Sequence, residues 1–464
     1  MPFESLPIDK GTFRVRRPES LVNSPFAEVL ENLFIDRSGS NIDRPALANV
    51  LTLESNNIVG MTYFGGVHVV VTSDRKQYAV DSNFSVSNIT GTLLPGSRRP
   101  VFANDGSNLY IAGGAAPLSW AGGNSVSALV SGSPPNCSHI IWTDGILLVN
   151  RLVQSEGYKV VQFSEVDDPA TWTGTNIFSN VGNPDPTVSL KVANRDVYCI
   201  GSETTEIWQN IGAVPVPFVR AYMWNYGTLA PYSAVVADNS LFFVSQYRKI
   251  VRFVDRQPVF ISDPIDVELR SYGSVSDCIA YQFSHGGTIH VLFLFPSAGR
   301  AWSIDLSNQN WTEWTDFSGR VRINALSEGA NEILCGDFEK GKIYNLSSDN
   351  KTDAGSPFVR RRRFSYRDSG GSIKKNAIRM RVTLNRSGAL QYDVDPMVEL
   401  RWKDAGKGWS RPRQASMGER GTEQKYVEFR RLSSYRLRQY EIRMTDPVEF
   451  AMSKVEVEEE AMSS

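Results

Sequence analysis

Short apolar stretches alternate with polar turns over most of this chain. Between Val197 and Pro264 the pattern occurs twice: an apolar run (VYCIG, then LFFVS) precedes a polar turn and a second run of branched and aromatic residues. β-branched and aromatic side chains suit a pleated, half-buried surface, and polar residues suit turns. Each copy is therefore predicted to form a β-hairpin.

Seven such hairpins follow one another along the chain. Their first strands are expected to start at Val67, Leu109, Ile146, Val197, Leu241, Ile289 and Ile333, with spacings of 37 to 51 residues. A repeat of this length in an all-β chain is typical of propeller blades. The pattern predicts a β-propeller over residues 56–350, with six or seven blades depending on whether the two ends share one. Its core is expected to include Trp208, Phe243, Leu292, Trp302 and Leu334.

The two ends of the chain do not follow the repeat. Residues 1–55 are predicted to form an extended N-terminal arm, although Ser24, Pro25 and Glu28 also permit one short helix. A polar stretch around Lys351 indicates a linker. After it, four stretches alternate apolar with charged residues, which predicts a separate antiparallel, β-sandwich-like domain over residues 351–464.

Charge is distributed unevenly although the whole chain is nearly neutral, with 49 basic and 50 acidic residues. Residues 357–464 carry 23 basic and 15 acidic side chains, and the preceding part carries 26 and 35. The densest feature is the run Arg360, Arg361, Arg362 and Arg363. It suits a protein interface, where arginine is enriched, but also a solvated strand face or contact with phosphates. Of these three alternatives, we predict a protein interface.

Nothing in the sequence predicts a metal, a cofactor or a catalytic centre. The four cysteines are far apart without a CxxC pair, and the four histidines are scattered. The start MPFESLPIDKG lacks the order of a signal peptide, and no apolar run reaches membrane-spanning length. We therefore expect a protein that is made in a reducing cytoplasm and does not insert into membranes.

A carbohydrate-acting enzyme is the alternative that a propeller raises. Glycosidases need two carboxylates facing one cleft. The candidate acids are Asp144, Glu203, Glu206, Asp238, Asp263 and Asp305. Most of them fall where hairpin turns or blade connections require Asp or Glu. The turn KDAGKGWS resembles the Asp-box turn of sialidase-like propellers, in which Asp404 is expected to accept bonds from backbone amides of the loop.

Three regions together resemble one protein family. They are GSETTEIWQNIG with FVRAYMWNYGTLAPYSAV, FLFPSAGRAWSIDLSNQNWTEW with CGDFEKGKIYNL, and VELRWKDAGKGWSRPRQASMGERG with RQYEIRMTDPVEF. Their content and order, from Val67 to Phe450, are similar to the packaged-DNA stabilisation proteins of short-tailed bacteriophages, also called tail hub or nozzle proteins. The N-terminal arm departs most from the family's pattern.

The resemblance implies a structural virion protein of the phage tail, without catalytic residues or cofactors. Such proteins form a ring, expected here to be a homohexamer, that extends the DNA channel below the portal and the head-to-tail adaptor. The ring retains packaged DNA until ejection and gives tailspikes or fibres a place to attach. A tail needle or plug, and genomic DNA that passes non-specifically, are further expected partners.

Within this framework the arm and the C-terminal domain would form the platform of the ring. Candidate contacts with a neighbouring subunit or the adaptor are Arg360, Arg361, Arg362, Arg363, Arg16 and Arg17. The arginine run is not expected to line the bore, because phosphate contacts there would hold the DNA and slow ejection.

Overall fold

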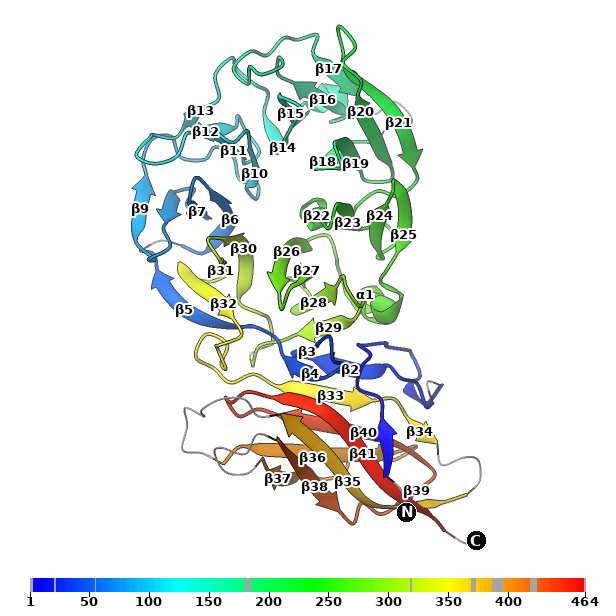
Figure 1. Cartoon of the computed structure of the whole chain (residues 1–464). Helices are drawn as coiled ribbons and strands as arrows, with labels where there is room; N and C mark the ends of the chain where they lie inside the picture. The colour runs from blue at the N-terminus through cyan, green and yellow to red at the C-terminus, as the bar shows by residue number, and fades with distance from the viewer. Residues whose placement is uncertain are drawn as a thin grey trace.

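The fold is a seven-bladed β-propeller joined to a β-sandwich, as Figure 1 shows. The computed structural model describes residues 3–20, 22–54, 56–179, 185–317, 319–368, 373–385, 395–417 and 424–462. The prediction of an all-β propeller with a second β domain is confirmed, and the number of blades is seven.

Each blade is a four-stranded antiparallel sheet. Blades 1 to 3 consist of β6 (Ile58–Phe64), β7 (Val67–Thr72), β8 (Gln77–Val80) and β9 (Val86–Ile89); β10 (Val101–Asn104), β11 (Leu109–Ala112), β12 (Leu118–Trp120) and β13 (Ala128–Leu129); and β14 (Cys137–Thr143), β15 (Ile146–Arg151), β16 (Val160–Phe163) and β17 (Ile177–Ser179). Blades 4 and 5 consist of β18 (Thr187–Ala193), β19 (Asp196–Gly201), β20 (Thr205–Asn210) and β21 (Phe218–Trp224); and β22 (Val235–Ala237), β23 (Ser240–Val244), β24 (Ile250–Val254) and β25 (Gln257–Phe260).

The last two blades involve other parts of the chain. Blade 6 consists of β26 (Ile279–His285), β27 (Thr288–Phe295), β28 (Arg300–Asp305) and β29 (Trp311–Trp314). Blade 7 consists of β30 (Ile323–Gly329), β31 (Glu332–Asp337), β32 (Lys342–Ser347) and, as its outermost strand, β5 (Ala46–Thr52). The register Ser347↔Ala46 to Lys342↔Thr52 shows that the N-terminal segment closes the propeller.

The seven strand starts found in the sequence all fall in the second strand of a blade, from Val67 in β7 to Ile333 in β31. A second strand has a hydrogen-bonded neighbour on each side and a blade packed on each face. In β19, for example, Val197 and Cys199 pack toward blade 3, whereas Tyr198 and Ile200 pack toward blade 5. Because both faces are buried, these strands are continuous apolar runs, which makes them the easiest strands to recognise.

A separate apolar core fills each of the seven interfaces between neighbouring blades. The predicted core residues Trp208, Phe243, Leu292, Trp302 and Leu334 are all buried. All four cysteines are free and buried. In the described part of the chain no helix has the length and apolar character needed to cross a membrane.

Replacing Trp208 by Ala is expected to lower the free energy of unfolding by about 3 kcal/mol, at the lower end for a buried tryptophan. The indole packs on Phe178 of blade 3 at 4.4 Å between ring centroids, and its Nε1 donates to Glu206 at 3.1 Å. Urea unfolding followed by circular dichroism measures the loss. A variant with wild-type stability would contradict this packing.

The sandwich packs two sheets around one apolar core. One sheet has the order β3-β4-β41-β35-β38, with β1 on β41 and β39 on β35. The other continues blade 6 without a break, in the order β29-β2-β33-β40-β36-β37, with β34 on β40. The bounds are β1 (Phe3–Leu6), β2 (Ala27–Glu31), β3 (Leu33–Ile35), β4 (Asn41–Asp43), β33 (Arg360–Phe364), β34 (Arg367–Asp368), β35 (Lys375–Asn385), β36 (Met397–Asp404), β37 (Arg413–Ser416), β38 (Gln424–Arg430), β39 (Ser434–Tyr435), β40 (Leu437–Met444) and β41 (Ala451–Ala461).

Helical structure in the described chain is limited to single turns and one short helix. These are η1 (Pro18–Ser20), η2 (Gln154–Glu156), η3 (Pro231–Ser233), η4 (Asp263–Ile265) and α1 (Asp266–Ser271).

The segment 1–55, expected to be an extended arm, instead supplies strands to three sheets. β1, β3 and β4 lie in one sheet of the sandwich, β2 lies in the other, and β5 closes the propeller. The short helix that Ser24 and Glu28 permit is also absent, because Ala27–Glu31 form β2. The segment did not follow the hairpin repeat because its strands pair with β29, β32, β33 and β41, hundreds of residues away.

Candidate functional site

The arginine run lies on β33, at the joint between the propeller and the sandwich (Figure 1). β33 is placed between β2 and β40, and its burial alternates residue by residue. Successive side chains of a strand point to opposite faces of the sheet. Arg360 and Arg362 therefore point into the sandwich, and Arg361 and Arg363 point outward.

Arg360 forms a buried ion pair within the chain. Its side chain is 0% exposed, and its Nε donates to Asp43 Oδ1 at 2.6 Å. Its other nitrogens donate to the carbonyl oxygens of Asp446 at 2.8 Å and Val448 at 3.1 Å. Burial raises the pKa of Asp43, and Arg360 opposes that shift. The pair joins the N-terminal segment to the loop before β41.

Arg362 is held in the same way, but by neutral acceptors. It is 1% exposed and donates to Asn41 Oδ1 at 3.0 Å and to the carbonyl oxygens of Pro7 and Lys10 at 3.0 and 3.1 Å. Burial lowers the pKa of this guanidinium, and Asp9 acts in the opposite direction. We predicted that Arg360 and Arg362 contact a neighbouring subunit or the adaptor. In this structure both side chains are instead enclosed by the chain's own N-terminal segment.

Arg361 and Arg363 form a charged grid on the outer face of the same sheet. Arg363 pairs with Glu441 at 2.8 Å, and Arg361 lies 3.2 Å from Glu31. Glu441 is 0% exposed and forms a second ion pair, with Arg401 at 2.6 Å. Trp409 covers the guanidiniums of Arg363 and Arg401 at 5.0 and 4.7 Å from its ring centre. The grid therefore holds four neighbouring strands together, β2, β33, β40 and β36.

A charged cavity of 630 Å³ continues from this grid toward blade 6. Glu313 on β29 pairs with Arg14, and with Arg300 at 2.9 Å. Arg14 also reaches Glu268 of α1 at 2.7 Å. Burial raises the pKa of Glu313, whereas Arg14 and Arg300 lower it. These contacts fix the N-terminal segment against the propeller.

Arg44 is a joint residue that the sequence analysis missed. It is 0% exposed and lies between the rings of Trp314 and Phe358, at 4.5 and 4.7 Å. It donates to Asn32 Oδ1 at 2.6 Å and pairs with Asp353. One side chain therefore links blade 6, the N-terminal segment and the linker. Arg44 could not be singled out beforehand, because no spacing pattern marks an isolated arginine.

Arg16 and Arg17, the other predicted contact residues, are exposed. They lie between Val15 and η1, close to Arg14 in the sequence. Their side chains are therefore open to another molecule, which remains a prediction.

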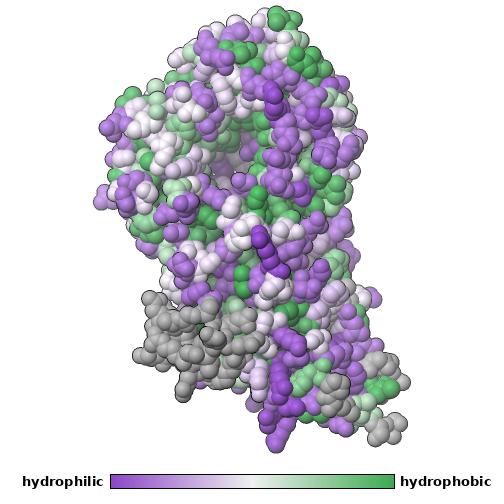
Figure 2. Space-filling view, in the orientation of Figure 1, coloured by the Kyte–Doolittle hydropathy of each residue, from purple (hydrophilic) through white to green (hydrophobic). Residues whose placement is uncertain are grey.

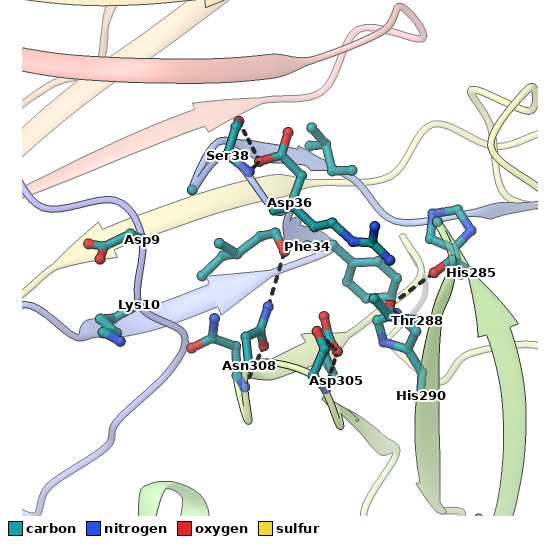
Figure 3. A pocket seen from close by; sticks show the side chains of 17 residues that line it. Asp9, Lys10, Phe34, Asp36, Ser38, His285, Thr288, His290, Asp305 and Asn308 are labelled. Atoms are coloured by element: carbon teal, nitrogen blue, oxygen red, sulfur yellow. Dashed lines mark hydrogen bonds between the residues drawn. The ribbon is translucent and has the colours of Figure 1, made fainter. Parts of the chain in front are cut away.

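A second cavity, of 580 Å³, opens on the joint beside β3 and blade 6 (Figure 3). Phe34 stacks on His290 at 4.6 Å between ring centroids and meets the edge of His285 at 5.6 Å. Burial lowers the pKa of His290 to about 4. Two carboxylates of this cavity accept hydrogen bonds from backbone amides of their own loops. Asp36 accepts from Ser38 N and Asp305 accepts from Ser307 N, both at 2.8 Å.

The six acids considered for an enzyme are spread over blades 3 to 6 and the turn η4, and four of them form ion pairs. Asp144 pairs with Arg195, Glu206 with Arg220, Asp238 with Arg252 and Asp263 with Lys249. Glu203 lies in the turn between β19 and β20, and Asp305 lines the cavity of Figure 3.

The prediction that the Asp404 carboxylate accepts hydrogen bonds from backbone amides of its loop, as in an Asp-box turn, is wrong. The Asp404 carboxylate accepts from Arg438 Nε at 2.7 Å, and the turn is closed by the main-chain bond from Lys407 N to Asp404 O at 2.9 Å. Arg438 is fully buried, so its charge attracts the carboxylate away from the loop amides. Asp105 and Asp337, at propeller turns, do accept bonds from loop amides in this way.

Residues 60–351 match the family model Phage_stabilise, described as "Bacteriophage P22 Gp10, beta-propeller". The match covers more than half of the chain and coincides with the seven blades apart from β5 and the first residues of β6. The chain belongs to this family. Members of the Phage_stabilise family are phage structural proteins, and this membership confirms the resemblance found in the sequence.

Other comparisons are more distant. No curated protein sequence matches this member of the family. Among solved structures it is similar to virginiamycin B lyase from Staphylococcus aureus (10% identity, 65% of this chain and 98% of that chain, TM-score 0.47). It is also similar to BamB from Moraxella catarrhalis (8% identity, 65% and 97%, TM-score 0.42) and the WD40 propeller domain of Doa1 (11%, 65% and 97%, TM-score 0.43). At these values nothing about function is drawn from them.

Proposed function

We propose that the protein is the hub, or nozzle, of a short phage tail. In this role six copies form a ring below the portal and the head-to-tail adaptor, extend the DNA channel, retain the packaged genome and carry tailspikes or fibres. The observation that carries the proposal is the match of the propeller to the phage stabilisation family. The protein would be made in the host cytoplasm and would act in the tail of the virion.

The joint supports a structural role. A hub that holds DNA under pressure needs its two domains fixed relative to each other, and one continuous sheet runs from β26 to β37. Buried ion pairs of Arg360 and Arg44 reinforce that sheet from inside. Arg360 and Arg362 are enclosed, so they are unavailable to DNA in the channel.

The proposal is tested with the phage that encodes the chain. Purified virions are expected to contain the protein, and tail complexes in electron micrographs are expected to show a six-fold ring that antibodies against it label. Particles assembled without the protein should fill with DNA and then lose it, and purified protein should restore retention. Virions that lack the protein yet keep their DNA would contradict the proposal.

Replacing Arg16 and Arg17 together by Ser is expected to weaken incorporation into tails severalfold while the free protein stays folded. A closed ring requires two different contact patches on each subunit, and both arginines are exposed beside the joint. Incorporation is measured by quantitative mass spectrometry of purified particles. The matched control replaces exposed Arg195 and Lys340 of the propeller by Ser, which removes the same charge. Equal incorporation of both variants would rule out the Arg16 and Arg17 contact.

A further inference from the structure

The axis of the propeller contains a cavity that neither the family match nor the joint explains. Its volume is 410 Å³, and the face of the propeller in Figure 2 is hollowed at its centre. Residues from all seven blades line it, among them Tyr63, Phe102, His139, Lys191, Tyr232, Tyr281 and Ser327. Cavities of this size accommodate small ligands.

One end of the cavity carries a fixed cation. Arg99 lies in the loop before β10 of blade 2 and contacts three other blades. Its guanidinium donates to Val59 O at 2.8 Å, Tyr281 Oη at 3.1 Å and the carbonyl and side-chain oxygens of Asn324 at 2.9 and 2.8 Å. These bonds join blades 1, 6 and 7 and hold the positive charge at the axis.

A second cation, Lys191 on β18, lies inside the cavity. Among the described residues it has no ion-pair partner, and burial lowers its pKa to about 8. Lys191 is half-buried, and an ammonium that is partly removed from water without a counter-charge is costly. His139 lies close to Lys191. Burial lowers the pKa of His139 to about 3, and the positive charges of Lys191 and Arg98 act in the same direction.

The other charged and titratable groups around the cavity do not neutralise Lys191. Tyr232 and Tyr281 are kept protonated, since burial raises the pKa of both. Glu328 is the acidic residue of the lining, and it is exposed and accepts from Ser284 N at 3.1 Å. The cavity therefore combines an unpaired lysine, a fixed arginine, neutral histidine and tyrosine side chains, and a peripheral glutamate.

We propose that this axial cavity binds a small oxyanion, a carboxylate or a phosphate, held by Lys191 together with the field of Arg99. The anion supplies the counter-charge that Lys191 lacks, and charge-assisted hydrogen bonds to an ammonium are among the stronger polar contacts. The site lies within a single chain, so it stands whether or not the protein forms the hub of a tail.

The test is calorimetric titration of the full chain with inorganic phosphate and, separately, acetate, at constant ionic strength in chloride. Binding at pH 7 is expected, and the two titrations distinguish the phosphate from the carboxylate. In Lys191→Met the affinity should fall at least about tenfold, the equivalent of one charged hydrogen bond. The control Lys249→Met, which removes a lysine paired with Asp263 outside the cavity, should bind like the wild type.

The pH dependence provides a second readout. Lys191 is charged below its pKa of about 8 and neutral above it, so affinity is expected to fall about tenfold from pH 7 to pH 9. If Lys191→Met does not fold, anomalous density from selenate in crystals of the wild type replaces it, and density at the axis supports the site. The proposal is overturned if neither anion binds, if Lys191→Met binds as tightly as the wild type, if the affinity does not change with pH, or if selenate binds only elsewhere.

Discussion

A chain from which residues 1–52 have been removed is expected not to fold. The deletion takes β5 from blade 7 and leaves β32 as an unpaired edge. It also takes β1 to β4 from both sheets of the sandwich, together with the buried partners of Arg360 and Arg362. A buried charge left without its partner lowers the free energy of unfolding by about 3–5 kcal/mol, whereas a whole domain is stable by only about 5–15 kcal/mol. Circular dichroism and size-exclusion chromatography should show an aggregated or unfolded product.

Removing only residues 1–5 is the matched control. Glu4 and Ser5 of β1 are exposed, and the strand pairs with β41, whereas Leu6 in the apolar core is kept. This variant is expected to fold with a small loss of stability. A cooperative thermal transition in the long deletion, equal to that of the short one, would mean that the segment is an accessory arm after all.

Replacing Arg360 by Ala is expected to lower the free energy of unfolding by about 5 kcal/mol, the upper end for breaking a buried ion pair. The change leaves Asp43 buried without its cation and leaves the carbonyl oxygens of Asp446 and Val448 without their donor. Chemical denaturation measures the loss. The matched control Arg361→Ala removes the same side chain from the outer, partly exposed face of the sheet and should lower the free energy of unfolding by about 1 kcal/mol or less.

Two further measurements separate charge from packing at Arg360. The double variant Asp43→Ala with Arg360→Ala should be more stable than Arg360→Ala alone, because the unpaired carboxylate is gone. In Arg360→Ala the folded state should hold a proton on Asp43, whose pKa burial already raises in the wild type. Its stability should then fall as pH rises from 5 to 8. A pH-independent deficit and no recovery in the double variant would indicate a pure packing effect.

The sequence predicted the strands that are buried on both faces. VYCIG and LFFVS lie in β19 and β23 and read as continuous apolar runs. The first strands of the blades were harder to recognise, because they line the axis and mix polar residues such as His139 and Lys191 with apolar ones. The outer strand β5 could not be assigned to a blade, since its partner β32 lies almost three hundred residues away and no local pattern reports such a pairing.

The joint was predicted only in part. The run Arg360 to Arg363 was predicted to contact another subunit or the adaptor, whereas its ion pairs in this structure are formed within the chain. The sequence offers no means of deciding whether the acidic partners come from the same chain or from another. Asp43, Glu31 and Glu441 are isolated acids with ordinary neighbours, and only the fold brings them to the arginines. Side chains along β33 point alternately to the two faces of the sheet, which explains why two of the four arginines are enclosed and two remain at the surface.

The closure of blade 7 by β5 has a consequence for synthesis. β5 leaves the ribosome long before β32, residues Lys342–Ser347, with which it pairs. At the usual rate of elongation this wait lasts about 15 to 60 s. During that time the buried side of β5, with Leu47, has no partner strand, and the sandwich strands β1 to β4 wait longer still for β33 to β41. The propeller can thus close only after Ser347 has been made, and the sandwich can be completed only after β41 has followed.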